Sequence, residues 1–419
     1  MAVFRKYSRG LETSRDAWVY NFSGDKLRAN VQRLIDNYNE QIRPFGEFVR
    51  ANDVARPGEA DVTSYLVATP GAADETRIKW SASLKQHLSR ATHAKHDLEA
   101  YRIGSYRPFT TEHVYFGPLL CHRRGELDTM FPTPHHENVG IYQVGNGSAV
   151  PFSAVMINGL PDLHVTGAGS GGQFFPRWTY TSAAADGALD LETGAIEPDE
   201  YGYRRVDNIT DEILTLYQEA VGSQVTKDDI FFYVYGLLHD PIYRETYAAD
   251  LKKMLPHIPT PESQERFEQL VAAGRGLSDL HIDYENVEPF RVDVQLKPGA
   301  DPDDPNTWRV TAKKMKWAKK KDPATGKNID DVTKLIYSPK ITISGIPPAA
   351  ERYMIGSRSA LAWIIDRYLV KTDSASGIVN DPNDWYVEHN NPRYVVDLIA
   401  KVTTVAVETV KIVDSLALE

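Results

Sequence analysis

The chain has 419 residues, of which 42% are hydrophobic and 25% are charged, which is the composition of an ordinary globular protein. Its formal net charge of −10 at pH 7, taken alone, argues weakly against a nucleic-acid partner, because phosphate binding favours basic domains. The sequence has no apolar run long enough for a membrane span and no apolar leader core, and its one cysteine, Cys121, excludes an internal disulfide. We therefore expect a cytoplasmic protein with no membrane partner.

The first ninety residues are expected to combine a mixed extended and turn segment (4–22) with helices separated by loops. Apolar residues at helical spacing predict a helix that starts at Asp25, and Pro44 should interrupt it before a short helix that ends near Arg50. Residues 52–75 are rich in proline and glycine and are expected to form loops. A further short helix is predicted over residues 82–90.

The middle of the chain changes from strand patterns to helix patterns. Short β-rich runs separated by Gly, Pro and Asn predict strands between Tyr101 and Tyr180. Residues 183–208 are expected to form an acidic loop. Four helices are predicted after it, over Thr210–Val221, Lys227–His239, Ile242–Met254 and Pro261–Leu277.

The last third is expected to mix strands and helices. Strands are predicted over Phe290–Leu296 and Trp308–Met315. Residues 335–385 show two short strand patterns, a turn and then a helix capped by Ser357 or Ser359. This strand–turn–helix segment resembles a rigid platform that presents basic and polar side chains.

Together these patterns predict a mixed α+β fold. A β-rich lobe (76–182) and a helical lobe (183–285) precede a mixed part (286–419), which contains the platform and a long amphipathic helix from 392 to 415. Residues 1–75 are expected to be linking helices.

The residue types of a catalytic centre occur without the spacing that catalysis needs. His122 and the run His135–Glu137 lack metal-ligand spacing and are interpreted as a solvated loop. The glycine-rich run 167–172 precedes a strand pattern, so we interpret it as a hairpin rather than a phosphate loop. The segment Asn391–Tyr394 resembles an amino-methyltransferase motif, but Arg393 replaces its second proline, which favours a simple helix start. We therefore expect no catalytic residue, cofactor or metal in this chain.

The basic residues are unevenly distributed and alternate with aromatic residues. Residues 306–340 carry ten basic and three acidic side chains, and residues 76–107 carry seven and two. Such side chains neutralise phosphates and release counterions, although a single lysine run can equally be a solvated loop. The candidate DNA-contacting residues are Lys79, Lys85, Arg90 and Arg107 in one group, and Lys313, Lys314, Lys316, Lys319, Arg358 and Lys371 in another. Arg358 and Arg177 are the candidates for reading bases.

Several long segments resemble one protein family. They are Ser105–Phe109, Phe174–Thr181, Tyr233–Pro259, Ile343–Tyr368 and Val370–Trp385. These segments are similar, in the same order, to the C-terminal part of type ISP restriction-modification enzymes. Those enzymes are single polypeptides that carry a nuclease, a helicase-like translocase, an adenine methyltransferase and a target recognition domain.

The resemblance implies that residues 76–419 form a target recognition domain and that residues 1–75 include the end of a methyltransferase domain. It implies recognition of a specific double-stranded DNA site. The neighbouring methyltransferase domain would use S-adenosylmethionine, and the helicase-like and nuclease domains would use ATP and Mg²⁺. The catalytic motifs of the family are missing here, so no catalytic role is carried over. Two alternatives stay open: a stand-alone DNA methyltransferase or nuclease with an unrecognised site, and a protein-interaction scaffold that uses the C-terminal helix.

Overall fold

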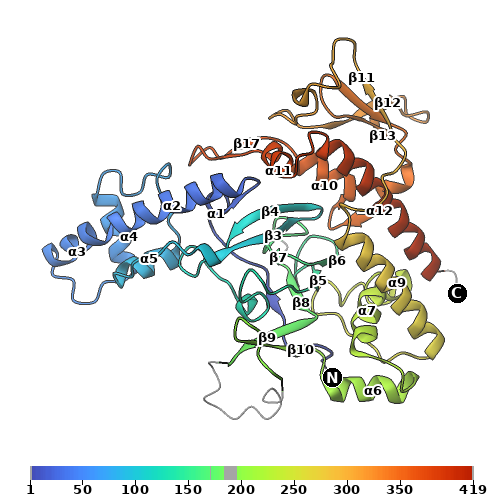
Figure 1. The fold of residues 1–419 in the computed structure, drawn as a ribbon, viewed down its shortest axis with the longest axis horizontal. Coiled ribbons are helices and arrows are strands. Elements are labelled where there is room, and N and C mark those ends of the chain that lie inside the picture. Colours follow the sequence, from blue (N-terminus) through green and yellow to red (C-terminus); the bar gives the residue numbers. More distant parts are fainter. Residues whose placement is uncertain (1, 170, 184–195, 418–419) are drawn as a thin grey trace.

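The N-terminal part of the chain forms a helical arm, at the left of Figure 1. The structure is a computed structural model that describes residues 2–169, 171–183 and 196–417. The helices of the arm are α2 (Gly24–Glu40), α3 (Ile42–Ala51), α4 (Glu59–Ala68) and α5 (Ala82–Ser89). The predicted helix from Asp25 is confirmed, because the Ser23 side chain accepts a hydrogen bond from the Lys26 amide and caps α2.

Helix α4 was not predicted, because its flanking residues were interpreted as loop signals. Gly58 is the N-cap of α4, and its amide donates to the Asp61 carboxylate. Pro70 lies just beyond the last helical turn. Glycine and proline therefore mark the two ends of a helix here rather than a continuous loop. Buried Val62 and Tyr65 hold α4 against the arm's other helices.

Two four-stranded sheets occupy the centre of the molecule (Figure 1). The strand order of the first is β1 (Ser8–Arg9), β8 (Gln173–Pro176), β5 (Gly140–Gln143) and β6 (Ala154–Ile157). The order of the second is β2 (Tyr20–Asn21), β4 (Thr110–Tyr115), β3 (Tyr101–Arg107) and β7 (Leu160–Pro161). All of these pairings are antiparallel except β3 with β7. The glycine-rich run leads into strand β8, as predicted, although its Ser170 lies outside the described residues.

Residues on both sides of position 75 share one hydrophobic core. Leu27 and Val62 belong to the same buried cluster as Leu84 and Val114. Strands β1 and β2, from the first 21 residues, also complete the two central sheets. The predicted boundary at residue 75 therefore does not separate two cores, and the origin of residues 1–75 in a methyltransferase domain stays a prediction.

The predicted acidic loop is partly a strand. Residues 184–195 of that loop lie outside the described residues, but Tyr203–Asp207 forms β10, which pairs antiparallel with β9 (Trp178–Ser182). Helices follow as predicted: α6 (Asp211–Val221), α7 (Lys227–Leu237), α8 (Pro241–Thr246) and α9 (Gln264–Ile282). Helix α8 is shorter than predicted, because the chain turns after Thr246 to place Leu251 in the core.

Two glycines allow α7 and α9 to approach closely. A Cβ atom at Gly236 would lie 2.1 Å from the Leu270 carbonyl oxygen, and one at Gly274 would lie 1.9 Å from that of Phe232. Any larger residue at either position would push the helices apart. This helix pair and α12 (Tyr394–Leu416) form the right side of Figure 1.

A third four-stranded sheet projects at the top of Figure 1, in the order β11 (Asp293–Leu296), β14 (Ile341–Ser344), β13 (Asn328–Ile336) and β12 (Lys316–Lys321). The predicted strand Trp308–Met315 is wrong. The backbone of Val310 pairs with the Asn383 side chain instead of a neighbouring strand, while Trp308 and Met315 anchor the segment in the core. The strand begins only at Lys316.

The two predicted strand patterns of the platform are the end of β13 and β14, and the predicted helix is α10 (Ala360–Arg367), but a short hairpin before α10 and a helix after Asp381 were not predicted. The hairpin β15 (Met354–Ile355) and β16 (Arg358–Ser359) leads into α10, and Ser359 caps this helix by accepting from the Ala362 amide at 3.1 Å. The hairpin β17 (Lys371–Thr372) and β18 (Val379–Asn380) and helix α11 (Pro382–Glu388) follow. The α+β expectation and the long C-terminal helix are thus confirmed. Within the described ranges, every helix is too short or too polar to cross a membrane.

Candidate nucleic-acid interface

Four cationic side chains gather around one carboxylate at the end of α10. Lys314 Nζ lies 2.6 Å and Arg358 Nη1 lies 2.9 Å from the two oxygens of Asp366. The Arg367 guanidinium also donates to Asp366, and Lys371 Nζ lies 3.5 Å from the Asp366 carbonyl oxygen. We call these five residues the Asp366 cluster. It brings together three of the predicted residues, Lys314, Arg358 and Lys371, from separate elements.

The Asp366 cluster carries more positive charge than its carboxylate can neutralise. Burial by itself raises the pKa of Asp366, but the hydrogen bond from Lys314 and the charges of Arg367 and Arg358 outweigh it and hold the pKa well below its usual range. Burial, followed by the charge of Arg367, lowers the pKa of Lys371. The side chains of Lys314 and Arg358 are 50% and 41% exposed. The cluster contains four accessible or half-buried cations and one carboxylate. This surplus of positive charge attracts anions to the surface.

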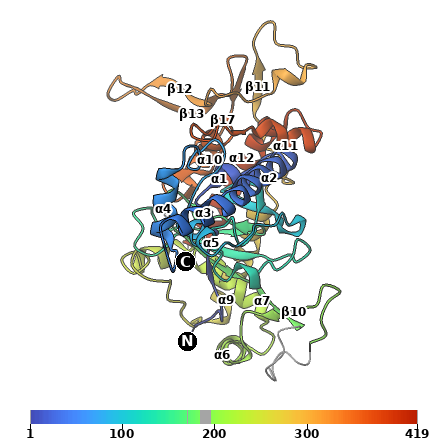
Figure 2. The same ribbon diagram turned by 90° about the vertical axis from the view of Figure 1, so that its left-hand side faces the viewer.

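The β12–β13 hairpin continues this positive surface and extends away from the body of the molecule (Figure 2). Lys319 pairs with Asp330 at 2.6 Å, so part of its charge is already neutralised. Lys313 and Lys316 are exposed, and within the described part of the chain no carboxylate lies at ion-pairing distance from either. Trp317 anchors the hairpin by packing against the core.

In the first group of predicted DNA-contacting residues, Lys79 is the one that lines a cavity next to a cavity lined by a residue of the second group. Lys79 and Asp373 line a cavity of about 390 Å³, and Lys371 and Asp373 line an adjoining cavity of about 480 Å³. Lys85 instead donates to Thr63 on α4 at 3.0 Å. Arg90 is exposed at the C-terminal end of α5.

Arg107 cannot make the predicted phosphate contact in this structure. Its side chain is only 10% exposed and lies 2.6 Å from the buried carboxylate of Asp162. The guanidinium also covers the Tyr106 ring at 4.0 Å. These contacts are structural, because they join β3 to the turn that follows β7.

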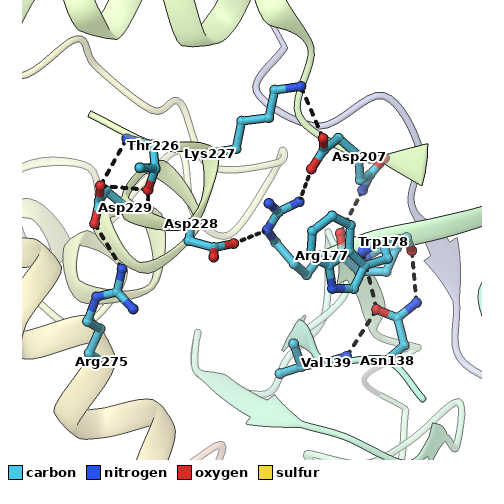
Figure 3. Close-up of polar contacts among 12 residues, drawn as sticks. Asn138, Val139, Arg177, Trp178, Asp207, Thr226, Lys227, Asp228, Asp229 and Arg275 are labelled. Carbon is cyan, nitrogen blue, oxygen red and sulfur yellow. Dashed lines mark hydrogen bonds and ion pairs between the residues drawn. The ribbon is translucent and has the colours of Figure 1, made fainter. Parts of the chain in front are cut away.

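Arg177 is likewise withdrawn from the predicted role of a base-reading residue. Figure 3 shows its guanidinium between two elements, with Nε 2.6 Å from Asp228 and Nη1 2.7 Å from Asp207. Lys227 also reaches Asp207 at 3.2 Å. The Arg177 side chain is 6% exposed and lies over the Trp178 ring at 3.7 Å. We call these five residues the Arg177 network; it fastens the β9–β10 hairpin to α7.

The prediction of a solvated loop at the histidine run holds for the exposed His135 and Glu137 and is wrong for His136. His136 is buried, and its ring nitrogens contact Thr133 at 2.6 Å and Asp199 at 2.8 Å. His135 stacks on Tyr201. Among the described residues, no group of three potential metal ligands comes together.

Three polar residues near the cluster were missed in the sequence. Arg367 is the fourth cation of the Asp366 cluster, and its position in the last turn of α10, where cations are favourable, was an available signal. The buried Glu112 and the half-buried Asn380 are hydrogen-bond partners 2.8 Å apart. They are 268 residues apart in the chain, so local patterns could not have joined them.

The comparisons with known proteins agree on one family. The family model of the Type ISP C-terminal specificity domain matches residues 2–398. A nuclease-deletion mutant of the Type ISP restriction-modification enzyme LlaGI, in complex with a DNA substrate mimic, is 33% identical with a TM-score of 0.77, over 99% of this chain and 33% of that chain. The ATP-dependent Type ISP enzyme LlaBIII bound to DNA is 29% identical with a TM-score of 0.76, over 99% and 23%.

A third solved structure, the DrdV–DNA complex, is 30% identical with a TM-score of 0.76, over 99% of this chain and 36% of that chain. The chain thus spans between 23% and 36% of the length of these three relatives. No curated protein matches the chain.

Proposed function

Because the chain belongs to the family of Type ISP C-terminal specificity domains, we propose that it recognises a specific site in double-stranded DNA for a restriction-modification enzyme. The related LlaBIII and DrdV structures contain DNA, and the LlaGI structure contains a DNA substrate mimic. The observation that carries the proposal is the positive surplus of the Asp366 cluster, next to the basic β12–β13 hairpin.

Contacts from this surface would go mainly to phosphates. Lys314 and Lys371 at the cluster, and Lys313 and Lys316 beside it, are placed to neutralise backbone charges and release counterions. Arg358 remains the candidate for reading a base, because its planar fork can bind guanine through two hydrogen bonds. Its present partner, Asp366, is shared with two other cations and can release it.

The chemistry of the enzyme would lie elsewhere in a longer polypeptide. We propose that the partners of this chain are the methyltransferase and helicase-like domains of the same protein, and that it positions a target adenine for the methyltransferase. S-adenosylmethionine, ATP and Mg²⁺ would be bound by those other domains. A stand-alone methyltransferase or nuclease would instead show saturable binding of S-adenosylmethionine or Mg²⁺ to this chain in calorimetry.

The test is the salt dependence of duplex binding, measured by fluorescence anisotropy between about 50 and 200 mM salt. We expect the logarithm of the binding constant to fall linearly with the logarithm of the salt concentration. Replacing Lys313, Lys314 and Lys371 together with alanine should reduce the slope by about 3. The matched control replaces the exposed Lys252, Lys253 and Lys411 and should leave the slope unchanged. Equal slopes for the two triple variants would contradict the proposal.

A further inference from the structure

A polar cavity lies directly beside the Asp366 cluster. It has a volume of about 480 Å³, and its walls come from α1 (Asp16–Val19), the ends of β3 and β4, and the β17–β18 hairpin. The exposed Lys371 lines this cavity together with Glu112, Tyr20, Asn380, Asp16 and Asp373. No residue of this cavity was predicted to have a role other than Lys371.

Glu112 has hydrogen-bonding capacity that the protein leaves unused. Its side chain is buried, and its Oε2 accepts from Asn380 Nδ2 at 2.8 Å. The Asn380 oxygen accepts from the Phe22 amide at 2.9 Å, which fixes the orientation of this amide group. Within the described residues the Glu112 carboxyl has no other hydrogen-bond partner. A carboxylate has room for several donors, so its remaining oxygen can accept from a molecule in the cavity.

Tyr20 is the second polar group at this wall without a full set of partners. Its hydroxyl is buried and has no hydrogen-bond partner among the described residues. Its ring lies 4.8 Å from that of Tyr106, whose other side is covered by Arg107. The Tyr20 hydroxyl is covered by neighbouring atoms, so the two rings form a wall of the cavity, and the incompletely used Glu112 carboxyl is the group that a polar ligand would complete.

Lys371 supplies a second constraint on the ligand. Lys371 belongs to the Asp366 cluster and also lies close enough to Glu112 for its charge to lower the pKa of that carboxyl, although burial, the larger effect, raises the pKa to about 7. Lys371 is exposed whereas Glu112 is 2% exposed, so a phosphate held at Lys371 would lie on the solvent side of the cavity and the Glu112 carboxyl on its protein side. A nucleotide has this arrangement, with its phosphate at one end and its base edge at the other.

We propose that this cavity receives one adenine or cytosine base that is turned out of the duplex and is distinct from the adenine presented to the methyltransferase, and that Glu112 accepts a hydrogen bond from its exocyclic amino group. The inference rests on the proposed function and deepens it. Glu112 is 2% exposed, so a base still stacked in the duplex cannot reach it. With the phosphate on the solvent side, the deepest atom of adenine or cytosine is the amino group, whereas that of guanine or thymine is a carbonyl oxygen. The ionised Glu112 carboxylate only accepts hydrogen bonds, so above about pH 7 it selects the first two bases.

The test uses the unmodified 419-residue chain and duplexes that contain one unpaired nucleotide, because an unpaired base leaves the stack at little cost. Fluorescence anisotropy should show binding about tenfold tighter to duplexes with an unpaired adenine or cytosine than to those with an unpaired guanine or thymine. Replacing the unpaired adenine with purine, which lacks the amino group, should remove this preference. Glu112→Ala should also remove it, whereas Asp128→Ala, at a half-buried carboxyl outside the cavity, should preserve it.

Equal binding to all four unpaired bases would overturn the inference, and so would an adenine preference that survives in both the purine duplex and Glu112→Ala. The purine comparison keeps the test decisive if Glu112→Ala does not fold. Either negative result leaves binding to the fully paired duplex, and with it the proposed function, intact. A chain that binds neither paired nor unpaired DNA would instead refute the proposed function.

Discussion

The Asp366 cluster and the Arg177 network are both built from arginine, lysine and aspartate, yet they differ in charge balance and exposure. In the cluster, Lys314 and Arg358 share Asp366 with other cations, and both are substantially exposed. In the network, Arg177 alone contacts two aspartates and is almost fully buried. The comparison teaches that an arginine is available to DNA when cations outnumber the carboxylates around it and water reaches it. The residue type alone does not decide this.

The largest effect is expected when the Arg177 network is disrupted. Arg177→Ala should lower the free energy of unfolding by about 2 kcal/mol, because it removes two charge-assisted hydrogen bonds and leaves Asp207 with Lys227 alone. Denaturant unfolding measures this change. Arg205→Ala is the matched control: Arg205 is exposed on the same Trp178 ring at 4.4 Å, and its removal should cost less than about 1 kcal/mol. Similar losses for both would show that Arg177 is not structural.

Glu112 extends the comparison to a buried carboxyl without an ion-pairing cation. Burial raises its pKa to about 7, against the hydrogen bond from Asn380 and the charges of Arg107 and Lys371, which lower it, while Asp16 raises it. Its contribution to stability should be complete below its unfolded pKa of about 4.3 and should be lost as pH rises through about 7. The free energy of unfolding of the wild type should therefore fall between these pH values. In Glu112→Gln this fall should be smaller by on the order of 1–3 kcal/mol, because glutamine does not titrate.

Denaturant unfolding of the wild type and Glu112→Gln across this pH range checks the point. The difference between the two proteins isolates Glu112 from Asp162, whose pKa burial also raises, to about 6. A difference that does not change with pH would contradict the assignment.

A smaller effect is expected when the charge surplus of the cluster is increased. Asp366→Asn removes the one carboxylate and should tighten duplex binding about threefold at low salt, with the gain fading as salt screens it. Anisotropy titrations measure the change. Asp25→Asn, which frees Arg28 on the distant helix α2, is the control and should have no effect. Weaker binding of Asp366→Asn would mean that the carboxylate orients the cations rather than competing with DNA.

The smallest expected effect is a difference in salt slope between variants of two lysines on the β12–β13 hairpin. Lys316 is exposed without an ion-pair partner in the described residues, whereas Lys319 pairs with Asp330. Lys316→Ala should reduce the salt slope of duplex binding by about 1, and Lys319→Ala by less, because its charge is partly neutralised before DNA arrives. The reverse order would show that the pairing with Asp330 does not persist in solution.

The sequence predicts local elements of this fold well, and pairings between distant segments poorly. The apolar face of α2 and the Ser359 cap of α10 follow from helix periodicity and capping chemistry. The irregular path at Trp308 does not, because Asn383, far along the chain, satisfies the backbone of Val310. Helix α4 was not predicted from the sequence, because glycine and proline mark helix ends as well as loops.

The same limit applies to the candidate interface. A run of basic residues identifies a positive region, but the sequence does not show which carboxylate each cation will meet. Lys314 pairs with Asp366, 52 residues away, and Arg177 pairs with Asp228, 51 residues away. These long-range contacts decide that Lys314 remains at the surface while Arg177 becomes part of the core.

The most direct test of the central claim is the acetylation rate of individual lysines in the unmodified chain, measured by mass spectrometry with and without duplex DNA. The account predicts that DNA slows the modification of Lys314, Lys316 and Lys371, while the exposed Lys253 and Lys411 react as before. Protection of Lys253 and Lys411 instead, or equal protection of all five, would contradict the assignment of the Asp366 cluster as the DNA-contacting surface.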